Sequence, residues 1–267
     1  MHCVAIFCPT TLDRVNLIFF KTALAQVLAA AGADGIVTIW NLTSLKSPEC
    51  IRILHHSGSR VMACTFSACG TLLASGDDQG LCRLFDVRGW NPLNSNALSP
   101  VQPTEDWGVT HELVGHHGTE RAISCLSFSS DSQMLASASM DTTVRVWKHC
   151  VDPPHAGQWV SSYCIHFPGP VNFIQFAPYG LQVVANCLND DRAYIWDIES
   201  MIQQQDPWVY EVLDCGDDKD EIACTSAAWC AFFPELLNFF VLFCWHAESV
   251  ARRTCCHVSD MLSCVVR

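Results

Sequence analysis

The sequence predicts an all-β fold assembled from repeated antiparallel units. Two observations support this: an aromatic pair recurs four times at nearly fixed spacing, and each repeat contains short apolar stretches separated by turn residues. The distances from the Phe to the second aromatic residue are 20, 19, 19 and 20 residues. The units are Val15–Phe20–Trp40, Val61–Phe66–Phe85, Ile123–Phe128–Trp147 and Val171–Phe176–Trp196.

The interior of each unit reads as short strands joined by tight turns. The third unit, residues 123–148, contains three apolar or alternating stretches with Ser- and Asp-containing turns between them. Alternation places Val144 and Val146 on one face of the last stretch, and Arg145 and Trp147 on the other. This pattern is typical of antiparallel strands in hairpins.

The period of the repeat predicts a β-propeller. Successive Phe positions lie 46, 62 and 48 residues apart, near the length of a four-stranded propeller blade. The longest interval holds an insertion at 89–111, rich in Pro, Asn and Ser, which we expect to be a surface loop. After a lead-in at 1–12, the sequence predicts four blades at about 13–45, 50–88, 112–150 and 160–200.

A fifth unit, 208–229, begins and then stops. Cys224–Trp229 repeats the opening strand, but no later residues supply the second strand, the turn Asp or the final Trp. Residues 230–267 have neither period and predict an irregular tail, either disordered or an artefact of the gene model. We therefore expect a partial propeller: a fragment, or an arc whose missing blades come from another chain.

The third unit resembles the WD-repeat signature. Gly115-His116 precedes it, and Ser139-Met-Asp-Thr-Thr-Val-Arg-Val-Trp147 ends it. The resemblance implies a buried hydrogen-bond chain of structural residues, here His116, Ser137 or Ser139, Asp141 and Trp147. A buried Asp is tolerated when its acceptors are satisfied.

The other units depart from this pattern. The resemblance implies Asp34 and Trp40 for the first unit, which has no preceding Gly-His, and Asp190 and Trp196 for the fourth. In the second unit it implies Asp78, with Phe85 in place of the Trp. We expect these blades to be less rigid than the third.

Composition argues against several classes of partner. The net charge of −12 disfavours direct binding of nucleic acid or anionic membranes. The 17 cysteines form no Cys-x-x-Cys pair, so we expect no metal; those in strand-like stretches, such as Cys64, Cys82 and Cys125, are interpreted as buried hydrophobes. Neither apolar segment, 17–31 or 231–245, reads as a membrane span.

The sequence shows no enzymatic motif. It contains no Gly-x-Ser-x-Gly, no phosphate loop, no His-Glu-x-x-His and no dinucleotide fingerprint, so we expect no catalytic residues and no cofactor. The pairs His55-His56 and His116-His117 fall in loops between blades, where a propeller has its structural His. The acidic run at 214–221 is interpreted as a solvated loop, since its spacing does not fit calcium.

One short motif suggests a partner. Phe85-Asp86-Val87-Arg88 resembles the Trp-Asp-x-Arg box through which many WD proteins dock on the damaged-DNA-binding adaptor of cullin ubiquitin ligases. The resemblance implies that Arg88 donates to acceptors on the adaptor. The first position is Phe, which departs from the box, and the alternative is a solvated Arg.

Residues 28–150 resemble the propeller of bromodomain-and-WD-repeat proteins (the PH-interacting protein-like group). This implies a nuclear chromatin scaffold, and several members of that group are ligase substrate receptors; no bromodomain is present. The alternative resemblance is to the WD subunit shared by general transcription factor and acetyltransferase complexes, and the alternative location is cytoplasmic. Loop-like aromatic and Arg residues are the expected protein-binding contacts: Arg60, Trp90, Trp107, Arg121 and Trp159.

Overall fold

The structure is a computed structural model. It describes residues 5–6, 15–21, 27–41, 49–56, 58–87, 108–188, 190, 192–204, 210–214, 222–230 and 239–246. These residues form five antiparallel sheets and one short helix. No helix in this part of the chain has the length and apolar character that crossing a bilayer requires.

The first three sheets each contain four or five strands in chain order. The first contains β1 (Ala5–Ile6), β2 (Val15–Lys21), β3 (Val27–Gly32), β4 (Ile36–Asn41) and β5 (Glu49–His55). The second contains β6 (Val61–Phe66), β7 (Leu72–Asp77), β8 (Leu81–Asp86) and β9 (Val109–Val114). The third contains β10 (Ile123–Phe128), β11 (Met134–Ser139), β12 (Thr143–His149) and β13 (Trp159–His166).

The last two sheets continue the same order. The fourth contains β14 (Val171–Phe176), β15 (Gln182–Cys187), β16 (Arg192–Asp197) and β17 (Tyr210–Asp214), with helix α1 (Ile198–Gln204) between the last two. Asp197 begins the helix: its Oδ1 accepts from the backbone N–H groups of Glu199 and Ser200. The fifth sheet pairs β18 (Ile222–Cys230) with β19 (Phe239–His246).

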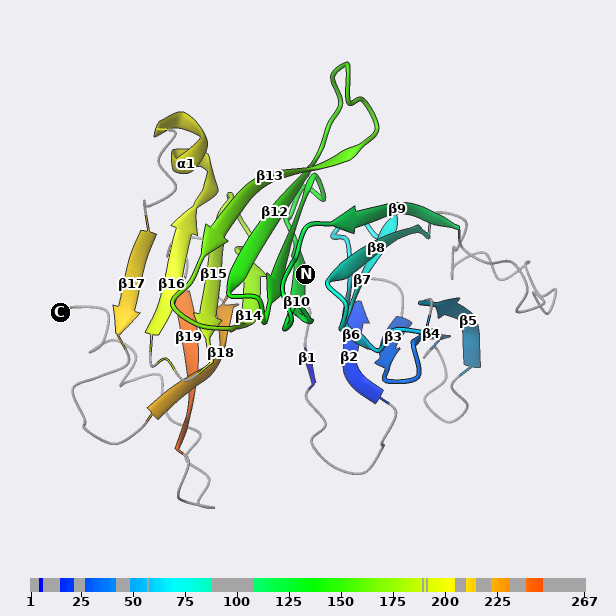
Figure 1. Cartoon of the computed structure of the whole chain (residues 1–267), viewed down its shortest axis with the longest axis horizontal. Helices are drawn as coiled ribbons and strands as arrows, with labels where there is room; N and C mark the ends of the chain where they lie inside the picture. Colours follow the sequence, from blue (N-terminus) through cyan, green and yellow to red (C-terminus); the bar gives the residue numbers. More distant parts are fainter. Residues whose placement is uncertain are drawn as a thin grey trace.

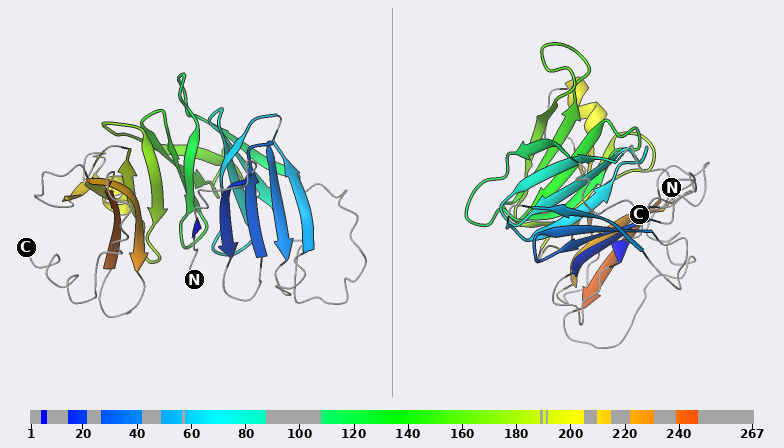
Figure 2. Two further views of the ribbon diagram at one scale, coloured as in Figure 1. Left: turned by 90° about the horizontal axis from the view of Figure 1, so that it is seen from below. Right: turned by 90° about the vertical axis from the view of Figure 1, so that its right-hand side faces the viewer.

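The sheets stand side by side as an open arc (Figure 1; Figure 2). The strands β2, β6, β10, β14 and β18 follow one another along its inner side, and each packs on the next. In the described residues no strand pairing joins the fifth sheet to the first. The all-β, partial-propeller fold expected from the repeat is therefore confirmed.

The sheets are offset by one strand from the repeats as they are counted in the sequence. The repeat placed at 50–88 begins within β5, but β5 pairs with β4 and so belongs to the first sheet. In the same way β9, at the start of the next repeat, pairs with β8 of the second sheet. Each repeat thus contributes an outer strand to the sheet before its own.

The apolar core lies between neighbouring sheets. One cluster of buried side chains joins the first three sheets, and a second joins the third and fourth. Cys64, Cys82 and Cys125 lie in this interior, which confirms that they pack as small hydrophobes. Small residues permit the close contact: a Cβ on Gly76 would lie 2.6 Å from Ile123 Cγ2.

The fifth sheet differs from the sequence expectation. β19 lies inside 230–267, where the sequence predicts an irregular tail, yet it pairs with β18 from Ile222 opposite His246 to Cys230 opposite Phe239. Backbone hydrogen bonds do not require the Leu-Ala-Ser pattern or the turn Asp of the other units, so a strand can form without the repeat's signature. The rest of that segment lies outside the described residues.

Candidate functional site

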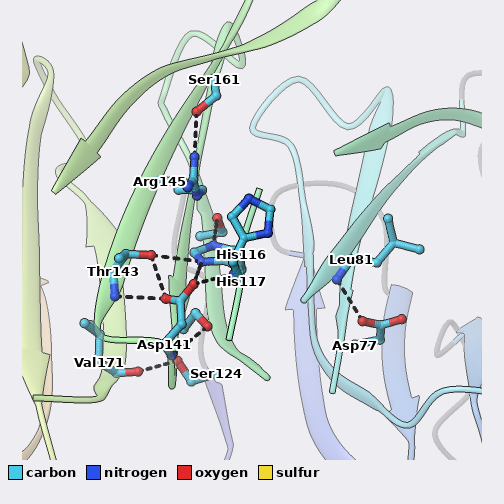
Figure 3. Close-up of polar contacts among 12 residues, drawn as sticks. Asp77, Leu81, His116, His117, Ser124, Asp141, Thr143, Arg145, Ser161 and Val171 are labelled. Atoms are coloured by element: carbon cyan, nitrogen blue, oxygen red, sulfur yellow. Dashed lines mark hydrogen bonds and ion pairs between the residues drawn. The ribbon is translucent and has the colours of Figure 1, made fainter. Parts of the chain in front are cut away.

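The loop before the third blade is tied to the blade by a chain of polar side chains. The indole N–H of Trp147 donates to Ser137 Oγ at 3.0 Å, and Ser137 Oγ lies 2.8 Å from His116 Nε2. His116 Nδ1 lies 3.0 Å from Asp141 Oδ2 (Figure 3). The structure thus brings together His116, Ser137, Asp141 and Trp147, and it selects Ser137 over Ser139.

The chemistry of the acceptors determines which atom donates at each step of this hydrogen-bond chain. An ionised carboxylate only accepts, so the proton of the His116 ring belongs on Nδ1, and Nε2 accepts from the Ser137 hydroxyl. Ser139 has a different role, since its Oγ accepts from the backbone N–H of Asp141 at 3.1 Å. Every member of the chain therefore has a partner although its side chain is shielded from water.

Asp141 is held as a carboxylate. Its Oδ1 accepts from the N–H and hydroxyl of Thr143 at 2.9 and 2.6 Å, and its Oδ2 accepts from the N–H of His117 at 3.0 Å (Figure 3). Burial acts to raise the pKa of Asp141, but the hydrogen bonds from His116, Thr143 and His117 outweigh it and hold the pKa well below its ordinary value.

The second blade has a related but looser network with a different acid, in which His56 Nδ1 has no hydrogen-bond partner among the described residues. His56 Nε2 bonds Ser75 Oγ, and His56 Nδ1 lies 3.6 Å from Asp77 Oδ2. Asp77 Oδ1 also accepts from the N–H groups of Gln79 and Leu81, at 2.9 and 2.8 Å. Burial raises the pKa of Asp77, but its bonds to His56 and to these N–H groups lower it overall.

The prediction of Asp78 for this network is wrong. Asp77 is 2% exposed. Asp78 is half-buried in the turn, and its Oδ1 accepts from Gln79 Nε2. Asp77 ends β7, where the alternation of the strand directs its side chain towards His56, and the neighbouring residue points away. Phe85 occupies the place of the Trp, with its ring centroid 6.4 Å from that of His56.

In the fourth blade aromatic packing replaces the polar chain. Phe167 takes the place of the loop His: its N–H donates to Thr142 O, as the N–H of His56 donates to Gly35 O. The ring of Phe167 packs on Tyr194 and Trp196, with centroids 5.4 and 4.7 Å away. Asp190 accepts from the hydroxyl of Tyr194 at 2.8 Å. Asp190 and Trp196 therefore do not form the predicted chain, because neither the His nor the Ser is present.

The first blade does not assemble the network either. Asp34 is exposed and accepts from the N–H of Ile36 at 3.2 Å. Trp40 Nε1 donates to Thr38 Oγ1 at 2.9 Å, within the same strand. Both predicted residues are thus used in local contacts, and no bond among the described residues links them to each other.

Two of the predicted protein-binding residues are buried, which corrects the prediction. Trp159 is 9% exposed and packs edge-on against Phe128, with centroids 6.1 Å apart. Phe85, the first residue of the proposed adaptor box, is 1% exposed. A side chain with almost no accessible surface cannot contact a partner unless the blade opens.

Two others remain accessible. Arg60 is exposed, and half-buried Arg121 donates from Nη2 to Gln79 Oε1 at 3.0 Å. Both precede the inner strand of a blade, at the end of the molecule that also carries the β7–β8 turn: the N–H of Asp78 donates to Arg60 O. Asp86 is half-buried at the end of β8, and Arg88, Trp90 and Trp107 lie outside the described residues.

The sequence reasoning missed Asp77 as the partner of His56, although a signal exists. Ser75 lies ten residues before Phe85, as Ser137 lies ten before Trp147, so the two serines correspond. Counting in the same way sets Asp77 against Ser139 and Gln79 against Asp141. Relative to Asp141, the acid of the second blade therefore stands two positions earlier, on the strand face that also carries Ser75.

In the described part of the chain no three His, Cys, Asp or Glu side chains come together as metal ligands.

A comparison with protein families agrees with this geometry. The model of the WD domain, G-beta repeat, matches residues 48–86 and 107–148. The chain contains WD40 repeats. Both matched segments end at the aromatic strand of a blade, and the second covers the whole His116 network.

Similar curated proteins carry the name HIR1. Protein HIR1 of Phaeosphaeria nodorum is 30% identical over 129 residues, which is 45% of this chain and 11% of that protein. Protein HIR1 of Gibberella zeae is 30% identical over 129 residues, 45% of this chain and 12% of that protein. Protein hir-1 of Neurospora crassa is 28% identical over 131 residues, with the same shares. The matches thus span about an eighth of these relatives or less.

A solved structure shares the fold. A chain in the crystal structure of the mitotic checkpoint complex superimposes with a TM-score of 0.57 and 19% sequence identity, covering 86% of this chain and 58% of that chain. At this identity the likeness shows the fold alone.

Proposed function

We propose that this chain is a non-enzymatic WD40 scaffold that binds other proteins through the loops between its blades. The observation that carries the proposal is the use of its buried titratable groups. His56, Asp77, His116 and Asp141 are each engaged in bonds that fix a loop to a blade. A buried His–Asp pair that ties a loop to a blade stiffens a binding platform, which is a structural role.

The binding surface is proposed on the end of the arc that carries Arg60 and Arg121. Both guanidiniums come from loops anchored by the networks, and arginines on a rigid support are frequent binding hot spots. Thr119 is exposed on the same loop as Arg121 and serves as a matched control.

The test is quantitative co-purification with cross-link mapping from cells that express the tagged chain. We expect a protein that cross-links to loop 115–122 and whose recovery falls about tenfold in R60A/R121A, with no change in Tm and no loss in T119A. Equal recovery of every cross-linked protein by R60A/R121A would contradict the proposed surface. Turnover of a small substrate by the purified chain would contradict the scaffold itself.

The finer proposal is a nuclear role in chromatin or transcription regulation, including substrate recognition for a cullin ubiquitin ligase. It is supported by the resemblance of residues 28–150 to bromodomain-and-WD-repeat proteins and by the box that ends at Arg88. The burial of Phe85 restricts docking on the adaptor to Asp86 and Arg88. Purified adaptor should bind the chain and release R88A; equal binding of both would overturn the ligase role.

The second candidate is a structural subunit of a general transcription factor or histone acetyltransferase complex, favoured by the likeness of residues 127–147 to the WD subunit of such assemblies. Under this alternative the chain co-purifies with its complex irrespective of Arg88. The same R88A variant therefore separates the two candidates.

A further inference from the structure

Arginines at equivalent positions in the second and third blades have different partners. Arg83 lies opposite Ser75 in its sheet, and Arg145 lies opposite Ser137, so each stands beside its blade's network serine. Arg83 donates from Nε to Glu112 Oε1 at 3.0 Å and from Nη1 to His55 O at 3.1 Å, and its Nη2 lies 2.9 Å from Glu112 Oε1. Each of its three nitrogens thus contacts a carboxylate or a carbonyl oxygen.

The carboxylate that Arg83 uses is missing in the third blade. Glu112 faces Arg83 across β8 and β9, and the residue that faces Arg145 across β12 and β13 is Cys164. The one hydrogen bond of Arg145 within the described residues runs from Nη1 to the hydroxyl of exposed Ser161, at 3.4 Å (Figure 3). Its Nε is shielded from water and has no hydrogen-bond partner.

The stem of Arg145 is nevertheless held in place. A Cβ on Gly115 would lie 2.9 Å from Arg145 Cδ and 2.8 Å from Trp147 Cη2, so the backbone of Gly115 packs directly against both side chains. A guanidinium with a fixed stem and unfilled donors is preorganised for a planar anion, because little side-chain entropy remains to be lost on binding.

The surrounding strands carry no competing acid. β12 and β13 contain Arg145, Lys148, His149 and His166, and neither strand contains Asp or Glu. Cys164 and His166, which pair with Arg145 and Thr143, are exposed on the same face as the guanidinium.

We propose that Arg145 is a docking point for an acidic side chain, Asp or Glu, of a bound polypeptide on the outer part of the third blade. The partner's carboxylate takes the place that Glu112 fills in the second blade and accepts from the terminal nitrogens of Arg145, with Ser161 beside it as a further donor. This inference rests on the proposed function, since it names a contact and the chemistry of the partner.

The test is a titration of the full chain followed by the arginine side-chain signals in ¹⁵N NMR, assigned with R145Q and R83Q. The probes are Ac-Glu-NH₂ and its uncharged analogue Ac-Gln-NH₂. We expect the Glu probe to shift the Arg145 signal saturably, the Gln probe to leave it unchanged, and neither to move Arg83. No saturable shift at Arg145, or equal shifts from both probes, overturns the proposal.

An internal carboxylate provides the matched control. C164E sets a Glu opposite Arg145, as Glu112 stands opposite Arg83, and should weaken binding of the Glu probe about fivefold or more; C164Q should not. If C164E does not fold, the wild-type titration still decides. Inorganic phosphate is the second arm: tighter binding of phosphate than of the Glu probe would overturn a carboxylate partner in favour of a phosphoryl group.

The outcome can be separated from that of the scaffold proposal. If the titration fails while R60A/R121A still loses its cross-linked protein, the docking point is wrong and the scaffold stands. If the titration succeeds and that protein is recovered from R60A/R121A as from wild type but is lost from R145Q, the docking point stands and the loop surface is wrong.

Discussion

Asp77 in β7 occupies the register position that Ser139 occupies in β11, yet it makes the contact to the loop His that Asp141 makes in the third blade. The His–acid contact is therefore shared by the two blades, although its acid comes from the last residue of the strand in one blade and from the turn after that strand in the other. The contact between loop and blade depends on where the carboxylate arrives and not on which residue supplies it.

Acid should weaken the fold through Asp141. Its pKa is depressed in the folded state, so the unfolded chain binds the proton more tightly, and protonation favours unfolding. The stabilisation is complete above the unfolded pKa of about 4 and is lost as the pH falls through the folded pKa. We expect D141N to lose about 2 kcal/mol of unfolding free energy at pH 7 and to show a flatter decline below pH ~4. Urea unfolding across pH measures this; D152N, at an exposed position, should behave as wild type.

Removal of the Ser137 hydroxyl should be costly. S137A leaves the indole N–H of Trp147 and Nε2 of His116 without partners in a buried site, and we expect a loss of about 1–3 kcal/mol. Ser139 is equally buried but accepts one backbone N–H, so S139A should cost less. If chemical denaturation gives equal losses of unfolding free energy for S137A and S139A, the hydrogen-bond chain through Ser137 adds no stability beyond burial.

Thr142 stores backbone strain in the third blade. Its φ is 68°, in the left-handed region, whereas the turns of the first and second blades have Gly35 and Gly80 with φ of 80° and 78°. T142G should therefore raise Tm, with a gain of up to about 1 kcal/mol. G58A gives the reverse measurement: Gly58 has φ of 80°, and a Cβ there would meet no atom within 4 Å, so backbone strain alone should lower Tm. A fall in Tm for T142G would mean that its side chain contributes more than the strain costs.

Cys69 should be the fastest thiol to alkylate among those described. Burial acts to raise its pKa, but hydrogen bonds from Ser132, Ser67 and Thr71 outweigh it and lower the pKa to about 7. The iodoacetamide rate should reach half its maximum near this pH, and C69S should abolish the fast phase. Cys50 is also an exposed residue, but partial burial of its thiol raises the pKa. It should therefore react slowly at pH 7. Equal rates for Cys69 and Cys50, followed by mass spectrometry, would refute the prediction.

The sequence predicts the blades because their signal is local. The Phe-to-aromatic spacing reflects strand and turn lengths, and the Gly-His before the third unit identifies His116. The choice between Asp77 and Asp78 depends on which of them shares the strand face of Ser75; residue type alone does not show this, whereas counting back from Phe85 indicates it. Trp159 looks like a loop residue in the sequence, but pairing with His149 makes it the first residue of β13 and turns it onto Phe128. The Arg145 site is also hidden, since it depends on the residue opposite in the next strand.

The one-strand offset between repeats and sheets has a mechanical consequence. His55 closes the first sheet and His56 anchors the second; His166 closes the third and Phe167 anchors the fourth. At each of these junctions a single peptide bond joins the outer strand of one sheet to the loop residue that anchors the next sheet. A displacement of the outer strand is therefore transmitted to that anchor. At these two junctions a sheet should therefore not separate from its neighbour without disturbing the neighbour's anchor, and we expect the first and second sheets, and the third and fourth, to open together.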